Sequence, residues 1–276
     1  MCGIIGIFNL KKETVNRKVL QSMADKIAHR GPDGQGYFIK DNIGLAHKRL
    51  AILDTSDNGA QPMSSRSNKW TIVFNGCIYN FSELKQELKS KGHTFSSETD
   101  TEVICEGLDA YGTEFFERLN GMFAIAAWNN ETKELFLSRD RFGVKPLYYW
   151  FNGDTICFAS EIKAIIKHPD YKMDVDLSAL NEYFSFQNVF SFNTLFKGVT
   201  MLPPANTVKI DTSTTFVKHK SWWDYDFTQT DEDMSFDDAK DETKRLFKQA
   251  VTRQMIADVP VGSYLSGGMD SGSITA

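Results

Sequence analysis

The sequence has few cysteines, and none of them form a paired motif. Its 276 residues include four, Cys2, Cys77, Cys105 and Cys157, which lie far apart without CxxC spacing. This spacing argues against a zinc site and against a disulfide framework. We therefore expect free thiols and a reducing compartment.

An excess of positive charge and long apolar runs are also lacking. The formal net charge is −5, so the surface offers no general basic face for nucleic acid or anionic lipid. No uninterrupted apolar stretch reaches the length of a membrane span. The sequence therefore predicts a cytoplasmic protein whose partners are small molecules, not nucleic acid or membranes.

Strand-like runs occur in groups, with helical periodicities between the groups. Strands are predicted over residues 4–8, 36–39, 44–52, 70–74, 123–128, 135–138, 147–150 and 155–159, and helices over 20–27, 82–91 and 101–112. Strands joined as hairpins, with helices between groups, favour an α+β fold in which two antiparallel sheets are flanked by helices.

The C-terminal part of the chain begins with an acidic segment. From Asp224 to Asp238 there are seven acidic residues and no Lys or Arg, which is typical of an exposed linker, predicted over 223–235. Ser235 is predicted to cap a helix with an apolar stripe. Residues 259–265 then predict a buried strand.

A Ser-Gly-Gly-Met-Asp-Ser segment follows that strand and predicts a phosphate-binding loop. Its glycines let backbone N–H groups approach an anion at a helix N-terminus, and Ser266 and Ser271 add hydroxyls. It is not a Walker loop, because no Lys-Ser/Thr follows the glycines. Asp270 would repel phosphate unless Mg²⁺ intervenes, which indicates a nucleotide–metal complex. The alternative is a glycine-rich turn.

Cys2 is a candidate nucleophile. Removal of Met1 would leave a thiol and a free α-amine on one residue. In N-terminal-nucleophile hydrolases the side chain attacks a carbonyl, while the residue's own amine, with an ordinary pKa of about 7.7–8.0, handles the proton. The alternative is an inert buried thiol.

Four further residues could complete such a site. The Asn75 amide and the Gly76 N–H can converge on one oxygen, as an oxyanion hole requires; the alternative is an Asn-Gly hairpin turn. Arg49 and Asp100 could bind the two charged ends of an amino acid. Their alternatives are a surface ion pair for Arg49 and a helix N-cap for Asp100.

Taken in order, the motifs of the chain resemble those of glutamine-dependent asparagine synthetase. The resemblance extends from residue 2 through the phosphate loop. Its motifs are Cys2-Gly3-Ile4, His29-Arg30-Gly31-Pro32-Asp33, Arg49-Leu50-Ala51-Ile52, Asn75-Gly76-x-Ile78-Tyr79-Asn80, Gly121-Met122-Phe123-Ala124, Arg139-Asp140-Arg141-Phe142-Gly143-x-Lys145-Pro146-Leu147-Tyr148 and Ser160-Glu161-x-Lys163-Ala164.

The resemblance implies two domains. Residues 2–222 would form a class II glutamine amidotransferase domain, a four-layer αββα N-terminal-nucleophile sandwich without a metal. Residues 236–276 would begin an α/β ATP-pyrophosphatase domain. The implied partners are L-glutamine, ATP with Mg²⁺ and L-aspartate, and a second copy of the chain in a homodimer.

The resemblance also implies roles for individual residues. Cys2 would hydrolyse glutamine to glutamate and ammonia, with Asn75 and the Gly76 N–H holding the oxyanion. Ammonia would then amidate an ATP-activated aspartate. The residues implied for glutamine binding are Arg49, Leu53, Asn75, Gly76, Cys77 and Asp100. Those implied for ATP are Leu265, Ser266, Gly267, Gly268, Asp270 and Ser271.

Two features depart from the family pattern. Cys77 stands where the family usually has a Glu that helps to hold the glutamine amino group. Losing one charge-assisted hydrogen bond costs about 1.5–3 kcal/mol, so we expect a raised glutamine KM unless Asp100 or another acid compensates. The sequence also ends at Ala276, inside the helix after the phosphate loop, and we expect such a chain to retain at most glutamine hydrolysis.

Other functions stay open. An amidotransferase of the same family could act on another carboxylate, such as a dipeptide. Enzymes that make glucosamine-6-phosphate or phosphoribosylamine share the first domain but would not continue into a pyrophosphatase loop, and β-lactam synthetase lacks the cysteine. A catalytically weak glutamine-binding module is the alternative of a different class.

Overall fold

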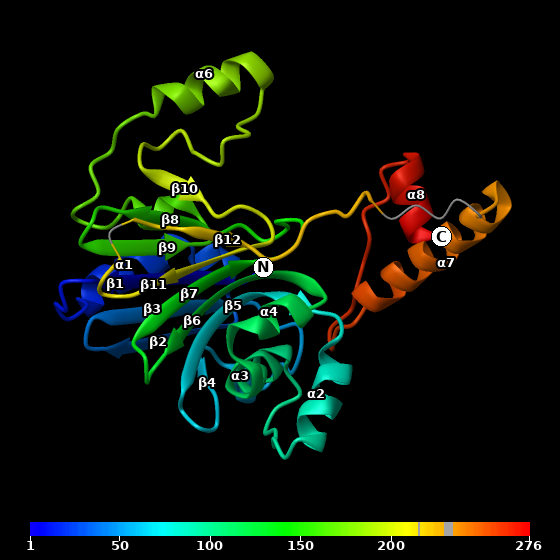
Figure 1. Cartoon of the computed structure of the whole chain (residues 1–276), viewed down its shortest axis with the longest axis horizontal. Helices are drawn as coiled ribbons and strands as arrows, with labels where there is room; N and C mark the ends of the chain where they lie inside the picture. Colours follow the sequence, from blue (N-terminus) through cyan, green and yellow to red (C-terminus); the bar gives the residue numbers. More distant parts are fainter. Residues whose placement is uncertain (215, 229–233) are drawn as a thin grey trace.

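The computed structural model describes residues 1–214, 216–228 and 234–276. Within these ranges two six-stranded antiparallel sheets are stacked face to face (Figure 1). The first contains, in spatial order, β10 (Val199–Met201), β8 (Tyr148–Phe151), β9 (Thr155–Ala159), β1 (Gly3–Asn9), β3 (Ile43–Arg49) and β2 (Gly34–Lys40). The second contains β12 (His219–Ser221), β11 (Asn206–Ile210), β7 (Glu134–Arg139), β6 (Gly121–Asn129), β5 (Trp70–Ile78) and β4 (Met63–Ser64).

Helices cover the outer face of each sheet and complete four layers. The first sheet packs against α1 (Arg17–Asp25) and α5 (Ile162–Ile165), and the second against α2 (Phe81–Ser90), α3 (Asp100–Tyr111) and α4 (Phe115–Arg118). Between the sheets lies a separate apolar core, in which Phe8 and Trp128 make an edge-to-face contact at 5.2 Å. The expected αββα sandwich is confirmed. Short 3₁₀ turns lie at η1 (Ala28–Arg30), η2 (Asp57–Gly59) and η3 (Gly112–Glu114).

Two strands end three or more residues away from the predicted position, and both differences affect the site. β5 continues four residues past the predicted 70–74 strand, because β6 pairs with it as far as Ile78. Asn75 and Gly76 therefore lie inside a ladder, and the hairpin-turn alternative is wrong. β3 ends at Arg49, before the predicted end at residue 52, so the residues after it form a loop.

A buried histidine joins the two sheets beside these strand ends. His47 of β3 donates from Nε2 to the carbonyl of Phe74 in β5, at 3.2 Å. Burial lowers the pKa of His47 to about 3, so the imidazole is neutral. The bond fixes the end of β3 against the middle of β5.

The loop after β7 is organised by a buried carboxylate. Asp140 is fully buried, and its oxygens accept backbone N–H groups at 2.9–3.1 Å from Phe123, Phe142, Val144 and Lys145. Beside it, the Arg139 guanidinium donates to three backbone carbonyls. These hydrogen bonds give Arg139 and Asp140 of the Arg139–Tyr148 motif a structural role, and they fix the backbone position of Lys145.

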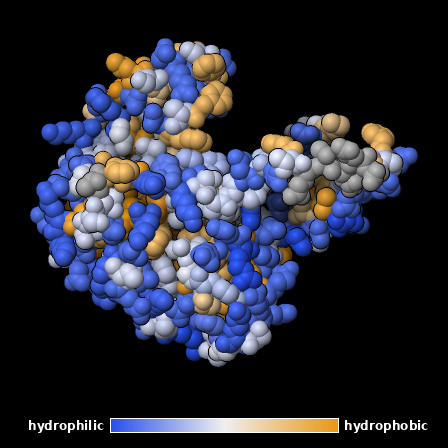
Figure 2. Space-filling model, in the orientation of Figure 1, coloured by the Kyte–Doolittle hydropathy of each residue, from blue (hydrophilic) through white to orange (hydrophobic). Residues whose placement is uncertain are grey.

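Three helices stand apart from the sandwich (Figure 1). α6 (Leu177–Phe186) projects on one side, and hydrophobic side chains gather on that lobe (Figure 2). On the other side lie α7 (Phe236–Gln254) and α8 (Met269–Thr275). Ser235 caps α7 as predicted, accepting the N–H of Asp238. The apolar stripe of α7 is largely exposed, and the residues that form it are Phe236, Ala239, Leu246, Phe247, Ala250 and Val251.

The predicted buried strand at 259–265 is wrong. The segment forms no strand, and Tyr264 is fully exposed. A strand needs a neighbour to satisfy its backbone groups, and among the described residues none lies beside this one. Residues 229–233 of the predicted acidic linker lie outside the described residues. Of the helices described, not one combines the length and the apolar character needed to cross a membrane.

The Asp140 network predicts a large loss of stability on truncation. Asp140→Ala removes the acceptor of four backbone N–H groups at a fully buried position. A buried donor that is left without a partner destabilises the folded state by about 1–3 kcal/mol. We expect the free energy of unfolding in urea to fall by about 3 kcal/mol or more. The control is Asp174→Ala, which removes an exposed ion pair with Lys197 and should cost less than about 1 kcal/mol. Equal losses in the two variants would contradict the analysis.

Candidate active site

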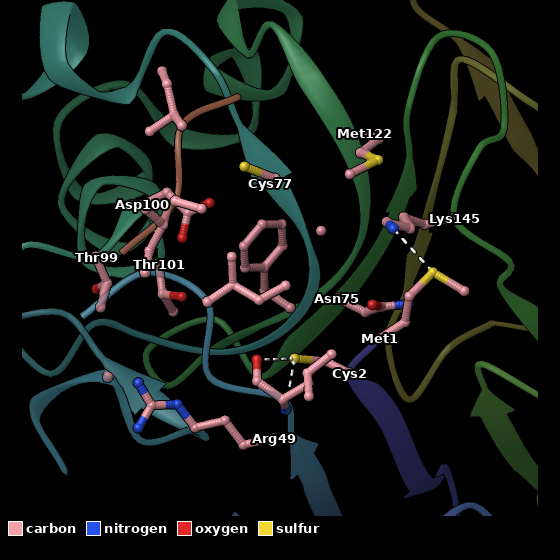
Figure 3. A pocket seen from close by; sticks show the side chains of 18 of the residues that line it. Met1, Cys2, Arg49, Asn75, Cys77, Thr99, Asp100, Thr101, Met122 and Lys145 are labelled. Carbon is pink, nitrogen blue, oxygen red and sulfur yellow. Dashed lines mark hydrogen bonds between the residues drawn. The ribbon is translucent and has the colours of Figure 1, made fainter. Parts of the chain in front are cut away.

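A cavity of about 200 Å³ lies between the start of β1, the end of β3 and the end of β5 (Figure 3). All the residues predicted to bind or hydrolyse glutamine line this one cavity. They are Cys2, Arg49, Leu53, Asn75, Gly76, Cys77 and Asp100. The sandwich therefore brings together residues from four separate parts of the sequence.

The Cys2 thiol is held by the backbone of Leu50. Its Sγ accepts the Leu50 N–H at 3.3 Å and lies 3.4 Å from the Leu50 carbonyl, to which it can donate (Figure 3). Burial raises the pKa of the Cys2 thiol above its ordinary value. The group is therefore a protonated thiol near neutral pH, and nucleophilic attack requires a base beside it.

Met1 lies between this thiol and Lys145. Its Sδ accepts a hydrogen bond from Lys145 Nζ at 3.1 Å (Figure 3). The α-amine of Met1 lies close to the site, and burial lowers its pKa. Cleavage after Met1 would place an α-amine on Cys2 itself, on the same residue as the thiol that needs a base.

Asn75 carries the most informative group in the cavity. Its side chain is 1% exposed, and its Nδ2 is buried without a hydrogen-bond partner among the described residues. A buried amide donor is normally paired, because leaving it unpaired costs about 1–3 kcal/mol. Asn75 lines the same cavity as Cys2 (Figure 3). The unpaired donor is therefore available to an oxygen of a bound molecule.

The N–H of Gly76 lies on the same side of the site. β4 pairs only with the first half of β5, so within the described ranges the second half has no strand on that side. There, side chains accept the backbone N–H groups instead: Gln61 accepts that of Phe74, and Asp100 accepts that of Ile78. Since a strand repeats every two residues, the Gly76 N–H points to this edge between those two bonds. A Cβ at Gly76 would lie 2.2 Å from the Met122 carbonyl, so only glycine fits.

Arg49 is held at one end of the cavity by the loop that follows it. Its guanidinium donates to the carbonyls of Ser56, at 2.6 Å, and Asp54. A Cβ at Gly59 would lie 2.0 Å from Arg49 Nη2, so this glycine makes room for the guanidinium. Within the described residues the hydrogen-bond partners of Arg49 are carbonyls, not a carboxylate, so the ion-pair alternative is wrong. The positive charge remains available to an anion.

Asp100 supplies the opposite charge. Thr99, not Asp100, is the N-cap of α3, since its side chain accepts the N–H of Glu102. Asp100 is 5% exposed, and burial raises its pKa to about 6. Its ionised form is thus present near neutral pH in a largely dry position. The cavity therefore holds a fixed cation and a fixed carboxylate.

Cys77 shares the inward face of β5 with Asn75. Burial raises the pKa of Cys77 to about 12, so the thiol is neutral and offers no charge to an ammonium group. Asp100, which lines the same cavity, remains the carboxylate available to such a group.

Several lining residues were missed by the sequence interpretation. They are Gln61, Thr99, Thr101, Met122 and Lys145, among others. Lys145 could have been noticed as the lysine of the Arg139–Tyr148 motif. No sequence pattern predicts the others, because they face the cavity only once α3 and β6 pack against β5.

The predicted phosphate loop lies away from this cavity. Gly267 has a positive φ of 85°, and Gly268 precedes α8 as its N-cap without a side-chain cap. The Ser266 and Ser271 hydroxyls are 2.9 Å apart. Leu265 and Asp270 are exposed. The loop offers exposed backbone and hydroxyl groups, with a carboxylate beside them.

Comparisons with known proteins identify the families that the chain matches. Residues 1–223 match the family described as glutamine amidotransferase domain, and residues 242–276 match the family described as asparagine synthase. Two relatives from Bacillus subtilis (strain 168) are named asparagine synthetase [glutamine-hydrolyzing] 3 and 1. They are 39% and 38% identical over 100% of this chain, which covers 45% and 43% of their lengths. The chain thus spans less than half of these relatives.

Solved structures share the fold. A glutamine phosphoribosylpyrophosphate amidotransferase from B. subtilis, complexed with ADP and GMP, aligns with a TM-score of 0.59 at 20% identity, covering 80% of this chain and 49% of that one. An allosteric regulatory enzyme of purine biosynthesis aligns with a TM-score of 0.61 at 18% identity, and the alignment again covers 80% of this chain and 49% of the other. At this identity the likeness supports the fold alone. By the match over residues 1–223, the chain belongs to the glutamine amidotransferase domain family, and its resemblance to the asparagine synthetases is confirmed.

Proposed function

We propose that the cavity hydrolyses the side-chain amide of L-glutamine to glutamate and ammonia, with Cys2 as the nucleophile. One observation carries the proposal: a buried, unpartnered Asn75 amide lies in the same cavity as the thiol. An oxyanion that forms next to the thiol would give this donor its partner. Such stabilisation is often the largest single contribution to acyl transfer.

The reaction proceeds in two halves. Once Met1 is removed, the α-amine of Cys2 takes the thiol proton as sulfur bonds to the amide carbon, and the carbonyl oxygen becomes an oxyanion. Asn75 Nδ2 and the Gly76 N–H donate to that oxygen. The C–N bond then breaks, and the amine returns the proton to the departing ammonia. Water, deprotonated by the same amine, attacks the thioester and releases glutamate and the thiol.

The two fixed charges orient the substrate. Arg49 binds the α-carboxylate, and Asp100 binds the α-ammonium group, so the side-chain amide reaches toward Cys2. The raised pKa of Asp100 suits this role, because binding of a cation restores the favourable environment that burial removed. With a neutral thiol at Cys77, we propose that the glutamine KM is higher than it would be with a glutamate there.

We further propose that the ammonia serves amide synthesis, as the names of the relatives suggest. The acceptor would be L-aspartate, with a dipeptide carboxylate as the alternative. The loop residues fit a phosphate group, since Gly267 and Gly268 expose backbone N–H groups next to the hydroxyls of Ser266 and Ser271. Asp270 would hold Mg²⁺. When bound, ATP would activate the acceptor carboxylate toward ammonia. A homodimer and a cytoplasmic location remain part of this proposal.

Glutamate release from L-glutamine tests the proposal directly. After intact mass has confirmed removal of Met1, the parent chain should release glutamate, and Cys2→Ala should reduce release at least about a thousandfold, because the covalent route is lost. Cys157→Ala, which alters another buried cysteine, is the control and should retain activity. A processed, folded parent chain that binds glutamine but releases none would favour the glutamine-binding module instead.

The raised pKa of Asp100 predicts a pH dependence. Only the ionised carboxylate binds the α-ammonium group, and it is lost as pH falls through about 6. The ratio of kcat/KM for the parent chain to that for Asp100→Asn should therefore be constant above pH 7 and fall toward one below pH 6. Taking the ratio cancels groups that both proteins share, such as the α-amine. A ratio independent of pH would exclude this role for Asp100.

A further inference from the structure

The chain that follows α7 lies on the rim of the glutamine cavity. Gln254, Ile256, Ala257 and Val261 line the cavity together with Leu53. Ile256 is partly buried and packs against the apolar cluster between the second sheet and its helices. These residues belong to the part of the chain that matches the asparagine synthase family, not the amidotransferase family. A segment from outside the amidotransferase domain thus forms one wall of the cavity.

Two hydrogen bonds join this segment to the loop that follows β3. The Asp258 N–H donates to the Ile52 carbonyl at 2.9 Å. The Asp258 carboxylate accepts the Asp54 N–H at 2.7 Å. The loop is thereby held through backbone groups at two positions, one on each side of Leu53.

Asp54 connects this contact to Arg49 and to the chain just before α3. Its carbonyl accepts from the Arg49 guanidinium, and its carboxylate accepts the N–H of Glu98, just before the N-cap of α3. Its φ is +46°, in a region that a non-glycine residue rarely adopts and that neighbouring contacts must hold. The bond from Asp258 to the Asp54 N–H is one of those contacts.

The amidotransferase sandwich does not need Asp258 for its own core. Asp258 is exposed, and α7, from which the segment leads, has no buried residue. The contact instead adjusts an exposed loop whose carbonyls position the Arg49 guanidinium. Its effect should therefore fall on substrate binding and leave the stability of the sandwich and the reacting groups at Cys2 and Asn75 unchanged.

We propose that Asp258 is a positioning residue through which the synthetase part of the chain sets the glutamine affinity of the amidotransferase site. The inference rests on the proposed function. Asp258 anchors Asp54, Asp54 orients Arg49, and Arg49 binds the glutamine α-carboxylate. Displacement of the 254–258 segment would loosen the loop and weaken glutamine binding while the chemistry at the thiol stays intact.

The test compares the glutaminase kinetics of the full chain with those of three variants. Asp258→Ala removes the carboxylate acceptor and should raise the glutamine KM about fivefold or more, with kcat changed less than twofold. Asp258→Asn keeps an oxygen acceptor and should stay within about twofold of the parent KM. Asp241→Ala, at an exposed aspartate of α7, is the matched control and should leave both constants unchanged. An unchanged KM in Asp258→Ala would overturn the proposal.

A second measurement does not depend on catalysis. In hydrogen exchange of the parent chain, the Asp54 amide should be protected, and protection should fall at least about tenfold in Asp258→Ala but not in Asp241→Ala. An unprotected Asp54 amide in the parent would overturn the proposal even if every protein hydrolyses glutamine. Failure of the proposed function is distinguished from this result, because it would appear as absent glutamate release in the parent itself.

Discussion

The packing of β1 and β3 against β5, across the interface between the two sheets, is the constraint on which the site depends. The strand pairing sets Cys2 opposite the end of β3, and His47 bonds to Phe74 to fix that end against β5. Asn75 follows Phe74 directly and points into the space that results. Sheet stacking therefore places the thiol and the amide in one cavity, although the two residues lie far apart in the sequence.

Two groups in the cavity reduce the stability of the folded protein. Asn75 holds a buried amide donor without a partner, and Asp100 holds a carboxyl group whose charged form is disfavoured by burial. Each would be better paired or better solvated in a site selected for stability alone. On the proposed function, both costs would be removed when glutamine binds, since its side-chain amide would bring an oxygen for Asn75 and its α-amino group would bring an ammonium for Asp100. The unpaired Asn75 amide and the buried Asp100 carboxyl group thus match two groups of the proposed substrate.

Much of this could be predicted from the sequence. The α+β fold followed from strand and helix periodicity, and the residues proposed to bind and hydrolyse glutamine came from short motifs and from the family resemblance that those motifs carry. The extension of β5 through Asn75 could not be foreseen, because an Asn-Gly pair is compatible with a turn until β6 is known to pair opposite it. Gln61 and Thr101 reach the cavity through tertiary packing, which no local pattern encodes. The strand at 259–265 failed because its apolar run requires a sheet that the described residues do not provide.

The central claim, that the unpartnered Asn75 amide stabilises the oxyanion, is tested most directly by the kinetics of Asn75→Ala with L-glutamine. The account predicts that kcat falls by about 10²–10³-fold while KM changes by less than about threefold, since the donor acts on charge that develops in the transition state. Asn188→Ala, at an exposed asparagine, should leave both constants unchanged. A folded Asn75→Ala protein with an unchanged kcat would contradict the account.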